Sequence, residues 1–379
     1  MQKLVLAFDS FKGSVNASEI TEHVTQAVHQ YRKDIQVVAF PIADGGEGTI
    51  ESVARCLPVR YVTCKIHGPL MEESEATYII TEDGTAVIEM AAASGLPLVA
   101  TSFRNPMNTT TFGTGEMIAD ALDKGCRNFV LGLGGSATND AGIGALNALG
   151  ISFKNDKKQE LKPIGRNLTQ IAHIDISCLR PELQESSFVI ACDVTNPFAG
   201  KNGAAYIYAP QKGASPEEVD FLDKGLQHYS KIILKETGID ISMLEGAGAA
   251  GGMGGGLLPF LNARLESGIA IILDLLHFDE AVRSADLVIT GEGKIDGQTG
   301  MGKALYGVLK TARKHHVPVI ALGGCIEEVS KLNDMGFTSV FSIQPAPVTL
   351  EKAMQKDYAL QNLKRTVVQI LRLLKRCSD

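Results

Sequence analysis

The segment KLVLAFDSFKGSVNASEITEHVTQAVHQY, residues 3–31, sets the pattern for both ends of the chain. It begins with a short apolar run, passes through the acidic turn DSFKGS at residues 9–14, and then changes to helical periodicity. Asn16 followed by Glu19 three residues later is typical of a helix start, and apolar residues then recur every three or four positions. The segment therefore predicts a strand, a polar turn and a helix in succession, which is the unit that builds parallel sheets.

The same succession recurs further along the chain. More strands are expected at residues 35–42, 287–290, 317–322 and 339–343. Helical stretches separate them, and the last helix carries an apolar stripe that reaches Leu374. We therefore expect one α/β domain with a parallel sheet built from both termini, residues 1–66 plus 282–379.

The middle of the chain has a different pattern. Residues 60–90 alternate between apolar and polar side chains, which predicts antiparallel strands. Beyond them, helices are expected at residues 115–124, 140–149 and 216–235, and strands at residues 128–133, 188–192 and 204–208. The longest of these helices is entered at Ser215 and Pro216, a favourable cap and first position. We expect an inserted second α/β domain with a mixed sheet, residues 67–281.

Composition excludes several classes of protein. The 379 residues carry a net charge of −7 without a Lys/Arg block, which argues against nucleic acid or an anionic membrane as a partner. The 7 cysteines are scattered and form no C-x-x-C pair, so neither a disulfide framework nor a zinc ribbon is expected. An acid at Asp9 interrupts any signal peptide, and no run of about 18 apolar residues is present. We expect a cytoplasmic protein.

Three acidic, glycine-rich turns follow strands of the terminal domain, at residues 9–14, 43–49 and 290–298. Ligands of open parallel sheets bind beyond the carboxyl ends of the strands. The side chains expected to converge there are Asp9, Lys12, Asp44, Glu47, Glu292, Lys294 and Asp296. Carboxylates beside lysines suit Mg²⁺ and phosphate oxygens. Asp and Gly also make ordinary turns, but three such turns at one sheet edge favour a functional site.

The middle domain contributes three further candidate segments. LGLGGSATNDAG, residues 131–142, predicts a strand, a Gly-Gly-Ser turn and a helix start; such a turn either binds an anion or is a plain turn capped by Asn139 or Asp140. CDVTNPFAG, residues 192–200, places Asp193 just after a strand. GAGAAGGMGGG, residues 246–256, is glycine-dense enough to approach a ligand closely or to act as a hinge.

Two motif matches are discounted. Residues 246–251 fit the G-x-G-x-x-G dinucleotide fingerprint, but a poor strand precedes them and more glycines follow where a helix is required. Residues 297–303 fit G-x-x-x-x-G-K, but Ala304 replaces the hydroxyl residue that holds Mg²⁺ in a P-loop. Lys303 remains a candidate phosphate contact.

Nine ordered blocks resemble the bacterial glycerate kinase family (type I). They are DSFKGS, PIADGGEGT, EMAAASGL, RNPMNTTTFGTGE, LGGSATNDAG, CDVTNPFAG, PQKGAS, GAGAAGGMGGGL and LVITGEGKIDGQT. The resemblance implies a Rossmann-like domain with an inserted α/β domain, and phosphorylation of D-glycerate by ATP. The implied product is 2-phosphoglycerate, with 3-phosphoglycerate as the alternative. The chain departs from the family at Met301, where members commonly carry His, and at Ala141, where they tend to carry Gly.

Phosphoryl transfer depends on positioning and charge neutralisation, and the candidate residues are assigned on that basis. We expect Mg²⁺ at Asp44, Glu47 and Glu292. Lys12 and Lys294 would neutralise the transferring group, and Asp296 or Asp193 would accept the hydroxyl proton. The residues expected to contact substrate or phosphate are Asp9, Ser10, Ser14, Arg104, Thr114, Gly134, Gly135, Ser136, Thr138, Asn139, Asn196, Gly252 and Gly254.

Two other functions stay open from the sequence. One is an NAD-dependent hydroxyacid dehydrogenase, which rests on the residues 246–251 match alone. The other is a non-enzymatic small-acid binding protein with two α/β lobes. The expected partners are D-glycerate and ATP, in a monomer or homodimer.

Overall fold

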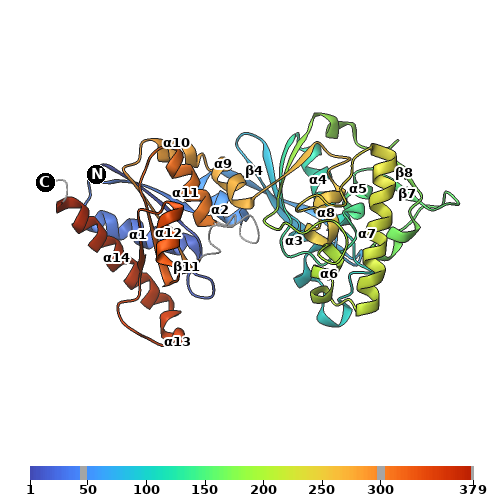
Figure 1. Cartoon of the computed structure of the whole chain (residues 1–379). Helices are drawn as coiled ribbons and strands as arrows, with labels where there is room; N and C mark the ends of the chain where they lie inside the picture. Colours follow the sequence, from blue (N-terminus) through green and yellow to red (C-terminus); the bar gives the residue numbers. More distant parts are fainter. Residues whose placement is uncertain (43–48, 297–303, 377–379) are drawn as a thin grey trace. The chain divides into compact units, whose positions relative to one another are not determined.

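The computed structural model describes residues 1–42, 49–296 and 304–376. The chain forms two compact units. The first is Met1–Asp44, Glu51–Leu57 and Ile269–Asp379, and the second is Gly45–Ile50 and Pro58–Gly268. Both termini belong to the first unit (Figure 1). The α/β class with a terminal parallel-sheet domain and an inserted mixed-sheet domain is confirmed, whereas the domain limits given above stay a prediction.

The first unit is built on a five-stranded parallel sheet in the order β13-β12-β11-β1-β2. Its strands are β1 (Lys3–Phe8), β2 (Gln36–Pro41), β11 (Leu287–Ile295), β12 (Val319–Ile326) and β13 (Ser339–Ser342). β1 pairs with the edge strand β2 on one side and with the central strand β11 on the other, so that Val5 lies beside both Val38 and Val288. Strands from the two ends of the chain thus share one sheet.

Helices cover both faces of this sheet. They are α1 (Ala17–Tyr31), α2 (Thr49–Cys56), α9 (Gly268–Leu275), α10 (Phe278–Arg283), α11 (Ala304–Lys314), α12 (Val329–Met335), α13 (Leu350–Ala353) and α14 (Lys356–Arg376). Side chains alternate along a strand, so Leu4 and Leu6 pack with α1 and α14, while Val5 and Ala7 pack with α9 to α12. α1 and α14 lie side by side (Figure 1). The sheet is therefore buried on both faces, as parallel sheets usually are.

The second unit contains a six-stranded mixed sheet in the order β10-β9-β6-β5-β4-β3. Its strands are β3 (Val59–His67), β4 (Glu73–Thr81), β5 (Thr85–Glu89), β6 (Asn128–Gly132), β9 (Ser187–Ala191) and β10 (Ala263–Glu266). The pairs β3–β4 and β4–β5 are antiparallel, as the alternation of residues 60–90 predicts, and the remaining pairs are parallel. Stacked rings of Phe129 and Phe188, with centroids 4.5 Å apart, mark its core.

The second unit also contains several helices, one of them 22 residues long. They are α3 (Ala91–Ser94), α4 (Phe112–Asp123), α5 (Ile143–Ala148), α6 (Ala204–Tyr208), α7 (Pro216–Thr237) and α8 (Ala249–Gly256). Five 3₁₀ helices cover Leu96–Leu98, Thr101–Phe103, Gly165–Gln170, Pro181–Glu185 and Pro210–Lys212, and β7 (Ser152–Lys154) pairs with β8 (His173–Asp175). The expected caps are present: Asn16 Oδ1 accepts from Glu19 N at 2.8 Å, and Ser215 forms a capping box with Glu218.

Three expectations about local structure are wrong. Residues 204–208 form α6 rather than a strand, because Ala204 and Ala205 bury a helical face that the following Tyr-Ile-Tyr run obscures. The segment from Thr290 to Ile295 continues β11 instead of forming a turn, since it keeps pairing with β12. Residues 249–256, whose glycines argued against a helix, form α8 around a left-handed stretch at residues 250–252.

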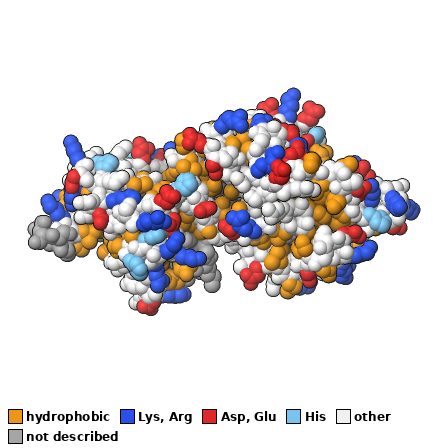
Figure 2. Space-filling view, turned by 90° about the horizontal axis from the view of Figure 1, so that it is seen from above, with side chains coloured by type: hydrophobic (Ala, Val, Ile, Leu, Met, Phe, Trp, Pro, Cys, Tyr) orange, Lys and Arg blue, Asp and Glu red, His pale blue; other side chains and the backbone are white. Residues whose placement is uncertain are grey.

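Surface charge matches the composition. Basic and acidic side chains are interspersed over the visible face of each unit (Figure 2). No helix of the described residues has the length and apolar character needed to cross a bilayer.

Candidate functional site

In the second unit, the segments that follow the parallel strands β5, β6 and β9 lie together. Backbone hydrogen bonds join them: Leu96 N donates to Gly135 O at 2.8 Å, and Ala137 N donates to Ser94 O at 2.9 Å. The glycine-rich segment joins the group through Gly251 O, which accepts from Ala141 N at 3.1 Å. This edge therefore gathers the predicted residues Thr114, Gly134, Gly135, Ser136, Thr138, Asn139, Asn196, Gly252 and Gly254 within one unit.

Asp140 holds the segment after the Gly-Gly-Ser turn. Its buried carboxylate accepts from Thr111 N and Thr111 Oγ1, both at 2.8 Å, and from Gly142 N and Gly144 N, both at 3.2 Å. Burial raises the pKa of Asp140, while these hydrogen bonds act in the opposite direction. α5 begins at Ile143, and its N-cap position is Gly142 without a side-chain cap, so the expectation that Asn139 or Asp140 caps this helix is wrong. The Asp140 carboxylate nevertheless accepts from Gly142 N and Gly144 N at the helix start. The helix start does not offer these N–H groups to an anion.

Lys212 is a residue that the sequence reasoning missed. Its side chain is 2% exposed, and its Nζ donates to Ser136 Oγ and to Thr138 O, both at 2.7 Å. Burial lowers the pKa of Lys212 to about 7, with the charge of Asp140 opposing that shift. Lys212 belongs to PQKGAS, residues 210–215, one of the blocks that carry the family resemblance, but no local pattern connects it to Ser136. Gly213 is left-handed there, and a Cβ would lie 2.2 Å from Arg104 O.

Buried polar atoms without a protein partner lie in the segment that Lys212 contacts. Among the described residues, Thr138 Oγ1 and both side-chain polar atoms of Asn139 have no hydrogen-bond partner. Both residues are fully buried. Buried polar groups are paired in the great majority of cases, so this cluster is the strongest polar signal at the sheet edge.

Other predicted residues of the second unit are held by protein contacts. Thr114 Oγ1 shares a 2.8 Å hydrogen bond with Ser94 Oγ, and Arg104 Nε donates to Val99 O at 3.1 Å. Asp193 Oδ1 accepts from Gly268 N at 3.0 Å. Asn196 uses both ends of its amide, donating to Asn202 O and accepting from Tyr208 OH.

The glycine-rich segment packs closely on the protein itself. A Cβ at Gly252 would lie 3.0 Å from Leu226 and Phe198 side-chain atoms, and one at Gly254 would lie 2.7 Å from Gly246 O. These glycines let α8 pack closely on neighbouring parts of the unit, and Gly251 brings it close to Thr138 O.

Gly251→Ala tests that approach. The backbone of Gly251 has φ +69°, and a Cβ there would lie 2.2 Å from Thr138 O, the carbonyl that accepts from Lys212. We expect unfolding free energy, measured in urea, to fall about 2 kcal/mol further than for Gly84→Ala. Gly84 is the matched control because it has φ +82° but no atom within 4 Å of the Cβ position. Equal losses in the two variants would contradict the close packing.

In the first unit, the predicted residues gather at the carboxyl edge of the parallel sheet. Asp9 N donates to Gly291 O at 3.0 Å, and the Cβ position of Gly293 lies 3.5 Å from Lys12 N, so DSFKGS lies beside β11. Ser10 N donates to Asp9 Oδ1, and Ser14 Oγ is buried without a hydrogen-bond partner among the described residues.

Lys294 joins two acids at that edge. Its Nζ lies 3.2 Å from Glu327 Oε1 and 3.5 Å from Asp296 Oδ2, and Glu327 is the main cause of the raised pKa of Lys294. Glu292 is half-buried on the same strand. Asp44, Glu47 and Lys303 lie outside the described residues, as does Met301. In the described ranges no group of three or more His, Cys, Asp or Glu side chains is arranged to hold a metal ion.

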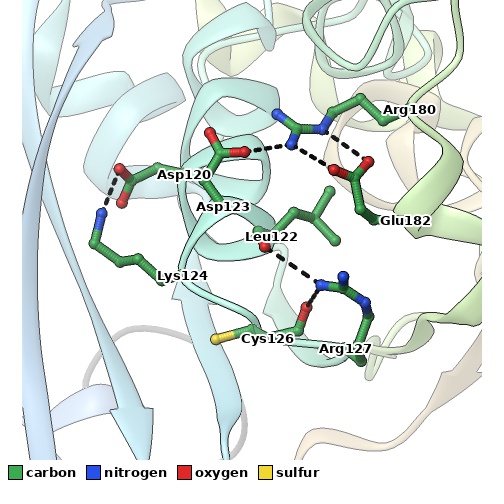
Figure 3. A network of polar contacts seen from close by, with 8 residues as sticks. All are labelled: Asp120, Leu122, Asp123, Lys124, Cys126, Arg127, Arg180 and Glu182. Carbon is green, nitrogen blue, oxygen red and sulfur yellow. Dashed lines mark hydrogen bonds and ion pairs between the residues drawn. The ribbon is translucent and has the colours of Figure 1, made fainter.

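The opposite edge of the second sheet carries paired charges instead. Arg180 bridges Asp123 and Glu182, Lys124 Nζ lies 2.6 Å from Asp120 Oδ1, and the network stands just before β6 begins (Figure 3). Surface ion pairs of this kind contribute little to stability. The chemistry is expected at the carboxyl edge, where polar atoms are buried without partners.

Comparisons with known proteins find relatives along almost the whole chain. A model of the Glycerate kinase family matches residues 4–375. The chain is 43% identical over 379 residues to a glycerate kinase of Bacillus cereus (strain ATCC 10987 / NRS 248), covering 100% of this chain and 99% of the relative. It is 43% identical over 358 residues to the glycerate 2-kinase of Escherichia coli (strain K12), covering 94% of each. A crystal structure from Salmonella typhimurium LT2, provisionally named glycerate kinase 2, superposes with a TM-score of 0.88 at 40% identity, covering 100% of this chain and 99% of the other.

Proposed function

Since the chain belongs to the glycerate kinase family and is therefore a kinase that acts on glycerate, we propose that it transfers the γ-phosphoryl group of ATP to D-glycerate and releases 2-phosphoglycerate. The product follows the relative named glycerate 2-kinase. The observation that carries the proposal is the full-length family match combined with a Gly-Gly-Ser turn at a sheet edge, backed by buried unpartnered polar atoms. The proposal extends to a cytoplasmic location and to a monomer or homodimer.

Individual roles follow from charge and position. Lys12 and Lys294 neutralise charge on the transferring phosphoryl group, because phosphoryl transfer depends on such electrostatic stabilisation. Asp296 accepts the proton of the glycerate hydroxyl; Asp193 is the second candidate, since one of its oxygens already accepts from Gly268 N. The turn at Gly134, Gly135 and Ser136 binds an anionic group. Arg104 and residues 113–115, which form the first turn of α4, are further candidates for the carboxylate.

Mg²⁺ is assigned to Asp44, Glu47 and Glu292. Glu292, the described member of this set, supplies the carboxylate oxygen that the ion prefers, at the strand end where Asp9 and Asp296 also lie. When bound, the ion offsets the negative charge of the phosphate oxygens.

Removal of metal gives a direct prediction. EDTA is expected to abolish turnover, because the phosphate charge is then not neutralised, and excess Mg²⁺ is expected to restore it. Turnover is measured as ADP release, with EDTA already saturated with Mg²⁺ as the control. Full activity in metal-free buffer would contradict the assignment.

Product analysis tests the function itself. D-Glycerate and MgATP are incubated with the protein, ADP is followed by a coupled assay, and phosphorus NMR distinguishes the 2-phosphate from the 3-phosphate. ADP with the 2-phosphate is the expected result. Formation of NADH from NAD and a hydroxy acid would support the dehydrogenase, and binding without turnover would support the binding protein.

A further inference from the structure

Lys212 is buried directly behind the Gly-Gly-Ser turn. Its Nζ is the donor in both 2.7 Å hydrogen bonds, so Ser136 Oγ acts as an acceptor toward it. The single hydroxyl proton of Ser136 is therefore not used in that contact. As whole residues, Ser136 is 8% exposed and Lys212 is 2% exposed.

We propose that Lys212 is the positioning residue of an oxyanion subsite at this turn, holding Ser136 so that its hydroxyl donates to a carboxylate or phosphate oxygen of the substrate. A donor that itself accepts from a cation is polarised and donates more strongly. This inference rests on the proposed function for the identity of the anion, which is glycerate or ATP.

The backbone around Lys212 is fixed independently of any ligand. Lys212 N and Ala214 N both donate to Ala209 O, at 3.0 and 3.1 Å, and the capping box of α7 begins at Ser215. On the other side, Gly95 and Ser136 form a backbone bridge. Two hydrogen-bonded turns therefore hold the amine and the hydroxyl next to each other, as a preorganised site requires.

The charge of Lys212 is not paired with a carboxylate of the described residues, so an anionic ligand can pair with it. Asp140 is the charged group that influences it, and the Asp140 oxygens are occupied by four donors from Thr111, Gly142 and Gly144. The buried Tyr229 hydroxyl is influenced by Asp140 as well. In the described part of the chain, no carboxylate forms an ion pair with Lys212.

Proton uptake on ligand binding distinguishes this role from a purely structural one, because a lysine that only supports the fold would not gain a proton when the ligand binds. With its pKa lowered from 10.5 to about 7, Lys212 holds fewer protons in the folded protein than in the unfolded chain between those values, so folding stability falls as pH falls through this range. An oxyanion at the turn favours the ammonium. Binding at pH 8 should then take up as much as about 0.9 proton, and binding at pH 6 almost none.

Calorimetry tests the inference without turnover. Binding is measured at pH 8 and pH 6 in two buffers of different ionisation enthalpy, with D-glycerate in one arm and a non-hydrolysable ATP analogue in the other. We expect proton uptake at pH 8 in the arm whose oxyanion occupies the turn. Ser136→Ala should raise the Kd in that arm about tenfold or more, and Lys212→Arg, which stays charged, should bind without proton uptake.

Lys231→Met is the matched control, because Lys231 is an exposed lysine on α7, the helix that follows the Lys212 turn. It should keep the wild-type uptake. If Lys212→Arg does not fold, as judged by its melting curve, the wild-type pH series and Ser136→Ala decide. The inference is overturned if the wild-type protein takes up no proton at pH 8 with either ligand. It is also overturned if Lys212→Arg takes up as many protons as the wild type. ADP formation without proton-linked binding overturns the inference alone, whereas proton-linked binding without ADP formation overturns the proposed function alone.

Discussion

Asp296→Asn lowers kcat at least about a hundredfold, the usual contribution of a general acid or base, while the melting temperature stays unchanged. Asp296 directly follows the last residue of β11, and Lys294 Nζ lies 3.5 Å from its Oδ2. A carboxylate at this place can accept the hydroxyl proton, and an amide cannot.

Glu327→Gln is the matched control for Asp296→Asn. Glu327 lies 3.2 Å from the same Lys294 Nζ and is half-exposed, so its loss removes an acidic neighbour of the lysine without touching Asp296. We expect its kcat to stay within about threefold of wild type, since a surface ion pair contributes little. If Asp296→Asn also stays within about threefold at unchanged melting temperature, the proton acceptor is reassigned to Asp193.

Asp140→Ala is expected to lower the free energy of unfolding by at least about 3 kcal/mol, because four donors would lose their acceptor in a fully buried place. Thr111 immediately precedes α4, and Gly142 and Gly144 belong to the start of α5. The Asp140 carboxylate thus connects the start of α4 to the start of α5.

Urea denaturation measures this loss, with Asp123→Ala as the control. Asp123 pairs with Arg180 in the surface network, but its side chain is 62% exposed (Figure 3). Its removal is expected to cost less than about 1 kcal/mol. Similar losses for the two variants would show that the hydrogen bonds of Asp140 contribute little.

Local sequence patterns were sufficient for much of the fold. Alternation and helix caps act over a few residues, so β1, the β3–β4 pair and the starts of α1 and α7 could be predicted. The end of β11 could not, because pairing with β12 rather than local propensity extends that strand through Glu292 and Lys294. Glycines within strands also resemble turns when the partner strand is unknown.

The candidate site was predicted in part for the same reason. The Gly-Gly-Ser turn and DSFKGS are short contiguous motifs, and the structure places both at carboxyl edges of sheets. Lys212 and Ser136 are 76 residues apart in the sequence, and a local pattern cannot predict a contact over that separation. Its burial depends on tertiary packing, which overrides the usual exposure of lysine.

The order of the strands has a consequence for synthesis on the ribosome. β1 is among the first segments to emerge, yet its partner β11 begins at Leu287, after the whole second unit has been made. The second unit can therefore complete its sheet during translation, while the apolar strand LVLAF, residues 4–8, waits with one edge unpaired. An unpaired apolar edge invites association with other chains. Nascent chains stalled before residue 287 should accordingly need chaperone protection at their amino-terminal end.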